Sequence, residues 1–344
     1  MYFQHRVLLA FAALAATMTS MVVAQDGGSP NSLSPAEVAQ VIDRIRLPMV
    51  SEKVLLEAMN ASGVLLRAGR YSEAAELLSV IARKKPNDAE VLYAQALAIF
   101  NTGRAPEAEP IARRAADILR SDGTLNDDNR VHKTADALVL LGVILAVKSD
   151  DAAALKAVQE AARIAPNHFD AQFALGRALF GTGDDSGSIR AFRAAKILQP
   201  SNPQALFFLA TTLERAGEIN EALATYRELI TLKPEMFEGH LGVGVLLLKG
   251  NPTNADEGLK EIERALEINP NLYEAHVTAG RALIGRGRPL DAVSHLQRAA
   301  ELAPNNPEPH YQLSLAYRRL GRKQEAADEA AIVKRIHESR RGTS

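Results

Sequence analysis

Three histidines, His240, His276 and His310, recur at intervals of 36 and 34 residues. Imidazole nitrogens bind metal ions and change charge near neutral pH, so the pattern raises a metal site or a proton-sensing site as hypotheses. Ligands of one metal must converge within a few ångströms, whereas equivalent positions on stacked helical units are about one helix diameter apart. The spacing therefore favours structural roles for the three histidines.

Other candidate chemistry is weak. Asp122, Asp127 and Asp128 lack the fixed alternation of oxygen ligands, the glycine and the closing glutamate of an EF-hand loop. The Gly-x-Gly segments at 181–183 and 285–287 lack the rest of a nucleotide-binding loop, and neither His-Glu-x-x-His nor Gly-x-Ser-x-Gly occurs. The sequence predicts no catalytic, cofactor-binding or metal-binding residues, and hence a non-enzymatic protein.

The composition narrows the class of protein further. Cysteine is absent, which excludes disulfides, thiolate metal sites and a lipid-modified cysteine. The net charge is −1, with acidic and basic residues interspersed, so the electrostatic footprint of a nucleic-acid-binding protein is missing. Aromatic residues make up only 5% of the chain and tryptophan is absent, which indicates a core of closely packed helices.

The amino terminus has the pattern of an export signal. His5 and Arg6 precede an apolar run over 7–16, and small or slim residues stand before Gln25. We expect cleavage after Ala24, an exported protein in the periplasm or secreted, and no stable membrane span after cleavage. An uncleaved anchor is the alternative, because residues 7–24 approach the shortest stretch that spans a bilayer.

The elements that position these residues follow from a repeat of about 34 residues. The register of this repeat is set by a series of prolines: Pro166, Pro200, Pro234, Pro270 and Pro304. Pro86 belongs to the same series, because it precedes Pro166 by two periods plus an insertion of twelve residues. Ten residues after each of these marks, or at the matching place, stands a small residue that lets two helices approach closely: Ser62, Ala96, Gly142, Gly176, Ala210, Gly244, Gly280 and Ser314.

A second mark lies seven residues further on, where a helix must stop and the chain must reverse. Six of the eight positions carry glycine, which tolerates the left-handed backbone conformation that such a stop requires, and Ser149 and Asn251 are the exceptions. The glycines are Gly69, Gly103, Gly183, Gly217, Gly287 and Gly321. Apolar residues recur at spacings of three and four on both sides, so each unit is predicted to form a hairpin of two amphipathic helices.

These marks, together with the segments LGRALFGTGDDSGSIRAFRAAKILQPSN and AGRALIGRGRPLDAVSHLQRAAELAPNN, resemble the tetratricopeptide-repeat family. The resemblance covers about five-sixths of the chain and implies an all-α fold, a right-handed α-solenoid of about eight helix-turn-helix units. We expect the units at 55–88, 89–122, 135–168, 169–202, 203–236, 237–272, 273–306 and 307–340, with an insert at 123–134.

The remaining segments are expected to be a signal peptide over 1–24, a flexible leader over 25–33, a capping helix with its connector over 34–54 and a tail over 341–344. Ser34 and Glu37 have the spacing of a capping box. Pro106 and Pro110 predict a late or kinked second helix in the second unit. Residues 121–133 are predicted to loop out, either as a binding element or as a tolerated insertion.

The resemblance also implies a binding groove, because the first helix of each unit in this family faces the concave side. The predicted groove residues are Tyr93, Leu97, Phe100, Val139, Val143, Phe173, Arg177, Phe180, Phe207, Arg215, Leu241, Val245, Arg281, Tyr311 and Arg318. This groove is apolar in its middle and basic toward the carboxyl end, which suits a protein or peptide segment with apolar anchors. Packing against the next unit is the alternative role for several of these residues.

The hypothesis from sequence is therefore an exported scaffold or adaptor that binds proteins, with envelope, secretion or polysaccharide-export complexes as the setting suggested by the family. The alternatives are an accessory subunit of an envelope enzyme and a homo-oligomer that assembles through the exposed ends of the solenoid.

Overall fold

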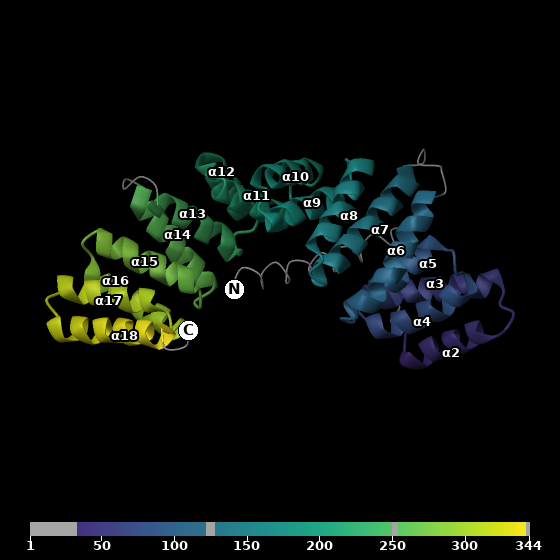
Figure 1. Ribbon diagram of the computed structural model, residues 1–344, viewed down its shortest axis with the longest axis horizontal. Helices are drawn as coiled ribbons and strands as arrows, with labels where there is room; N and C mark the ends of the chain where they lie inside the picture. The colour runs from purple at the N-terminus through teal and green to yellow at the C-terminus, as the bar shows by residue number, and fades with distance from the viewer. Residues whose placement is uncertain (1–32, 122–127, 250–253, 342–344) are drawn as a thin grey trace. The chain divides into compact units, whose positions relative to one another are not determined.

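The computed structural model describes residues 33–121, 128–249 and 254–341, and every regular element in these ranges is a helix (Figure 1). The helices are α2 (Pro35–Arg46), α3 (Glu52–Arg67), α4 (Tyr71–Lys84), α5 (Ala89–Asn101), α6 (Ala105–Ser121), α7 (Asp128–Val147), α8 (Asp151–Ile164), α9 (Phe169–Thr182), α10 (Asp185–Leu198), α11 (Pro203–Arg215), α12 (Ile219–Leu232), α13 (Phe237–Lys249), α14 (Ala255–Ile268), α15 (Tyr273–Gly285), α16 (Pro289–Leu302), α17 (Pro307–Arg319) and α18 (Lys323–Arg341).

The helices from α3 onward form successive pairs, and we call the two members of a pair the first and the second helix of a repeat. The chain divides into two compact units, 1–200 and 201–344. In the first unit, α3 to α10 pack in chain order, each helix against the next. In the second unit, α11 to α18 do the same (Figure 1). The predicted all-α repeat fold is therefore confirmed.

Neighbouring first helices also contact one another directly. In the first unit α7 contacts both α5 and α9, and in the second unit α11, α13, α15 and α17 form the corresponding series. Second helices pack against the first helix of the following repeat, as α8 does against α9. Within each unit, the first helices therefore share one closely packed face, which is the face on which the sequence places the groove.

The turns between the paired helices have the conformation that the glycine positions predict. All six predicted turn glycines have positive φ angles, between 71° and 84°. Ser149, which takes the glycine position in the third repeat, has a φ of 63° and is the one non-glycine residue with positive φ in the described parts of the chain. The turn is thus set by the repeat architecture, because a serine is held in the left-handed region at the same place.

The small residues of the first helices are sites of close contact, as predicted. A Cβ atom added to Gly142, Gly176 or Gly280 would lie 2.5–2.7 Å from a side chain of the paired second helix. The side chains met are Val158, Phe192 and Leu296, each 16 residues after its glycine. One large side chain per repeat therefore fills the space that the glycine leaves.

Helix α2 covers the amino-terminal end of the first unit. Ser34 and Glu37 form the expected capping box, with the Ser34 backbone N 2.7 Å from Glu37 Oε2. The helix buries Val38, Ile42 and Ile45 and contacts α3 and α4. A helix with one apolar face therefore protects the core of the first repeat from solvent.

Two local predictions are wrong, a late start of the second helix in the second repeat and a loop that includes residues 128–133, whereas the alternative of a kinked helix stays a prediction. Helix α6 does not begin late: it starts at Ala105, ahead of Pro106 and with Pro110 inside it. Residues 128–133 do not loop out, because they form the first turns of α7. This stretch contains no glycine or proline, and Arg130 Nε donates to the Leu119 carbonyl 3.1 Å away at the end of α6, which fixes the start of α7.

The predicted signal peptide, residues 25–32 of the predicted leader and residues 122–127 lie outside the described residues. So does Asn251, the second predicted exception among the turn glycines. Within the described ranges, no helix combines the length and the apolar character needed to cross a bilayer.

Candidate functional site

The predicted groove residues of the first unit are mostly core residues. Leu97, Val139, Val143, Phe173, Arg177 and Phe180 are all buried, with exposures of 5% or less. These residues lie on α5, α7 and α9, which are apolar on nearly every side. The positions expected to face a groove therefore pack against neighbouring helices. For these six residues the structure supports the packing role that the sequence left open.

Phe173 shows how such a position is filled. Its ring stacks on Phe169 at a centroid distance of 5.6 Å and lies tilted against Phe192 of the second helix at 5.7 Å. The guanidinium carbon of Arg177 lies 6.0 Å from the centre of the Phe173 ring. Burial lowers the pKa of Arg177 to about 9. Arg177 is thus an inward-facing arginine and does not contribute to a basic surface.

Tyr93 and Phe100 remain half-buried on α5 and pack against the core of the first unit. Burial raises the pKa of the Tyr93 hydroxyl, and the negative charges of Asp136 on α7 and Asp170 on α9 raise it further. Three neighbouring first helices therefore bring a phenol and two carboxylates near one another.

Asp136, His168 and Asp170 form a polar cluster that the sequence analysis did not identify. One ligand atom from each lies within 4.8 Å of the other two. Nε2 of His168 is 3.1 Å from Oδ1 of Asp136, and the exposures of the His168 and Asp170 residues are 2% and 7%. The spacing of His132 and Asp136, four residues apart in one helix, is a signal that could have pointed to this cluster.

The electrostatics of the cluster are mixed. Burial disfavours the charged form of His168, but the contact with Asp136 and the negative charges around it outweigh burial and raise the pKa of the imidazole. Burial raises the pKa of Asp170, with His168 opposing the shift and Asp136 adding to it. Two carboxylates thus lie close to one buried imidazole.

The predicted groove residues of the second unit are more accessible. Phe207 and Leu241 are half-buried, Val245 is buried, and Arg215, Arg281 and Arg318 are exposed. Tyr311 is 58% exposed, which is unusual for an aromatic side chain of this size. Among the described residues, neither Arg281 nor Arg318 has an ion-pair partner. The second unit therefore presents an exposed tyrosine, Tyr311, and two exposed arginines, Arg281 and Arg318, on its first helices.

The three histidines have structural roles, as the sequence indicates. Nε2 of His240 lies 3.1 Å from the Pro234 carbonyl, and Nε2 of His276 lies 3.0 Å from the Pro270 carbonyl. Each histidine faces the second helix of its own repeat through Nδ1, and the three do not converge on one point. No shared metal site is built from them.

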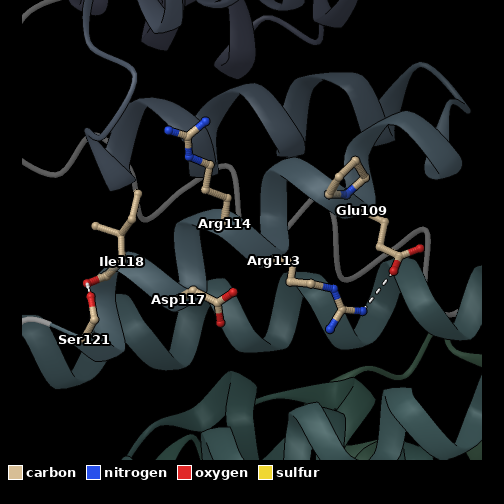
Figure 2. Close-up of a pocket in the computed structure, with 7 residues that line it drawn as sticks. Glu109, Arg113, Arg114, Asp117, Ile118 and Ser121 are labelled. Carbon is tan, nitrogen blue, oxygen red and sulfur yellow. Dashed lines mark hydrogen bonds and ion pairs between the residues drawn. The ribbon is translucent and has the colours of Figure 1, made fainter.

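A shallow hollow of about 460 Å³ lies along the exposed side of α6 (Figure 2). Its lining includes Glu109, Arg113, Arg114 and Asp117, and Arg113 pairs with Glu109 at 2.9 Å. The labelled residues all come from the single helix α6 (Figure 2), and Arg114 donates to Asn87 Oδ1 2.8 Å away. The hollow therefore has the character of an ordinary solvated helix surface.

Comparison with known families agrees with this architecture. A family model described as tetratricopeptide repeat matches residues 64–123, 152–203 and 277–338, and a second model of the same description matches 203–236. The matched segments cover more than half of the chain. This chain is a tetratricopeptide-repeat protein.

The solved structures that resemble this repeat protein have low sequence identity. The C-terminal part of a TPR repeat-containing protein from Cytophaga hutchinsonii is 15% identical, with a TM-score of 0.56, over 74% of this chain and 98% of that one. YrrB, described as a TPR protein with an unusual peptide-binding site, is 19% identical, with a TM-score of 0.49, over 58% of this chain and 96% of that one. MamA from Desulfovibrio magneticus RS-1 is also 19% identical, with a TM-score of 0.47, over 50% and 96%. No curated protein matches the chain.

Proposed function

We propose that this tetratricopeptide-repeat protein is a non-enzymatic scaffold that binds a segment of another protein on the first-helix face of its second unit. Repeat proteins of this type use extended surfaces along the array to hold other macromolecules. The observation that carries the proposal is the pair of exposed arginines, Arg281 on α15 and Arg318 on α17, without ion-pair partners among the described residues.

The unpaired arginines stand out because charged residues elsewhere in the second unit are commonly paired. Arg227 pairs with Glu257 at 2.7 Å, and Arg298 pairs with Glu301 at 2.6 Å. Helices α15 and α17 contact each other directly, and both arginines lie on first helices at predicted groove positions. Two adjacent repeats therefore offer positive charge on one face.

Apolar groups accompany this charge. Phe207 and Leu241 occupy the fifth position of α11 and α13, and Tyr311 occupies the same position of α17. A partner that fits is an extended or helical segment with apolar anchor residues followed by acidic residues, since arginine recognises carboxylates well in fixed geometry. The burial of Phe173 and Phe180 removes them from this surface, so the proposed surface is smaller than the groove expected from sequence.

The cellular setting is part of the proposal. The amino-terminal pattern of His5, Arg6 and the apolar run supports export to the periplasm or beyond, where an adaptor of this class would take part in assembling an envelope or secretion complex.

Selection of peptides from a displayed random library on the purified chain tests the binding function. We expect enrichment of peptides that combine apolar and acidic residues, and loss of binding in the double variant Arg281→Glu with Arg318→Glu. Leu290→Ser on the second helix α16 is the matched control, because Leu290 is 66% exposed but lies outside the proposed surface.

The outcomes separate clearly. Retained binding in the charge-reversal variant, or loss of binding in Leu290→Ser alone, would refute the proposed surface. Capture from a crosslinked envelope extract with the same pair of variants then identifies the natural partner.

A further inference from the structure

The polar cluster in the first unit has the composition of a metal site. We propose that Asp136, His168 and Asp170, together with His132, bind one divalent transition-metal ion of the zinc type. This inference is independent of the peptide-binding surface, which lies in the second unit.

The geometry of the cluster is the first support. The three inner residues bring one ligand atom each to within 4.8 Å of the others. Zinc bonds to imidazole nitrogen and carboxylate oxygen are about 2.0–2.2 Å long, so small rotations of the two aspartates are enough to place three ligands around one ion. The ligand set combines imidazole with carboxylate, which favours zinc and its neighbours over calcium or magnesium.

The second support is a buried polar atom without a hydrogen bond. Nε2 of His168 is buried and has no hydrogen-bond partner, although Asp136 lies at ion-pair distance. Buried polar atoms in folded proteins are nearly always satisfied, so an unsatisfied nitrogen facing two carboxylates calls for an explanation. A bound cation would take the nitrogen lone pair and would neutralise the carboxylates at the same time.

The cluster is also held in place by the backbone. His168 is the N-cap residue of α9, and Nδ1 accepts a hydrogen bond from the Ala171 backbone N–H with a length of 3.3 Å. Asp170 lies in the first turn of the same helix, and Asp136 lies in α7, which contacts α9 directly. Ligation through Nε2 moves the ring proton to Nδ1, so the long Ala171 hydrogen bond is lost on metal binding, while the placement of Asp170 in the first turn of α9 and of Asp136 in α7 remains.

His132 supplies the fourth ligand from the solvent side. It lies one helical turn before Asp136, and its ring centre is 5.1 Å from that of His168, at an interplanar angle of 51°. Because His132 is exposed, it can turn toward the ion without disturbing the core. The ligands thus run from the surface to the interior, which gives the ion a path of entry.

Titration calorimetry of the chelator-treated chain with zinc chloride tests the proposal. We expect one zinc per chain, a rise in melting temperature on zinc addition, and visible absorption bands of tetrahedral geometry when cobalt(II) is used instead. The double variant Asp136→Asn with Asp170→Asn should lose binding, and His132→Ala should bind at least about tenfold more weakly. His132→Ala is informative even if the double variant fails to fold, because His132 is exposed.

The control variant is His276→Gln, which removes a histidine of the second unit. The proposal is overturned if zinc does not bind, if the His132 and aspartate variants bind as tightly as the parent chain, or if His276→Gln alone abolishes binding.

Discussion

Nδ1 of His276 lies 3.2 Å from Nδ1 of His295, so two imidazoles meet where the neighbouring repeats pair a histidine with a glutamate. In those repeats, Nδ1 of His240 is 2.6 Å from Glu261 and Nδ1 of His310 is 2.6 Å from Glu329. The Pro270 carbonyl can only accept, so Nε2 of His276 carries its proton and Nδ1 accepts from His295. A second proton on His276 would turn its Nδ1 from an acceptor into a donor that faces the N–H of His295, and protonation of both rings would bring two cations together.

This pair predicts acid sensitivity in the second unit. Burial lowers the pKa of His276; the hydrogen bond to Pro270 opposes this shift and the charge of Arg298 adds to it. Burial also lowers the pKa of His295, with His276 adding to the shift and the charge of Asp291 opposing it. The unfolded chain therefore binds more protons than the folded chain as the pH falls through about 6.5, and stability decreases with falling pH.

The substitution His295→Glu should remove this sensitivity, because it restores the histidine–glutamate pair of the adjacent repeats. Urea unfolding at pH 7.5 and pH 5.5 measures the difference between the variant and the parent chain. The reciprocal change Glu329→His should introduce acid sensitivity in the last repeat. Equal pH dependence in all three proteins would contradict the assignment.

The close contact at Gly280 predicts a large effect of one methyl group. Gly280→Ala should destabilise the chain by roughly 1–3 kcal/mol, since its Cβ would lie 2.5 Å from Leu296. Gly285→Ala at the end of the same helix is the matched control, because nothing lies within 4 Å of its Cβ and its φ is not positive. We expect this control to be neutral or stabilising by up to about 1 kcal/mol in thermal and urea unfolding.

The left-handed conformation of Ser149 predicts a stabilising substitution. Ser149→Gly should raise the free energy of unfolding by about 1 kcal/mol, because glycine adopts a φ of 63° without the steric cost that serine carries. The reverse test is Gly183→Ala, which places a side chain at a φ of 84° and should destabilise by a similar amount. If the midpoint of denaturant unfolding were unchanged in both variants, the backbone of these turns would carry no steric cost that depends on the residue.

The burial of Phe173 predicts that this residue supports the fold and does not contact a partner. Phe173→Ala should cost about 3–5 kcal/mol of stability, whereas Phe207→Ala, at a half-buried position, should cost less and should weaken peptide binding. Comparing unfolding curves with peptide affinities for the two variants separates the roles. A stable Phe173→Ala protein with weakened peptide binding would instead show that Phe173 contacts the peptide.

The repeat marks predicted the architecture well because they report local backbone and packing requirements. A glycine at the turn and a small residue at the helix contact act within one hairpin, so Gly69 and Gly280 could be interpreted without the rest of the structure. The start of α7 was missed because it depends on Arg130 reaching the end of α6, a contact that composition does not indicate.

The binding positions were harder to predict than the fold. The family geometry gives the direction of a first-helix residue, but whether it reaches solvent depends on the residues that face it from the next helix. Val139 and Tyr311 occupy the same position of the repeats predicted at 135–168 and 307–340, yet Val139 is fully buried and Tyr311 is 58% exposed. The polar cluster was missed because Asp136 on α7 and His168 at the N-cap of α9 are far apart in the sequence and meet only where α7 packs against α9.

The junctions between repeats in the second unit are alike, so one whole repeat could be removed or added without changing the junction. Removing residues 272–305 would join Asn271 to Asn306 and recreate the Pro-Asn-Asn-Pro sequence that precedes α17. Asn306 would still cap α17, and α14 would meet a first helix of the same register. Duplication or loss of such a 34-residue cassette is therefore a simple evolutionary path for this protein, and it would alter the number of binding positions without redesigning any single contact.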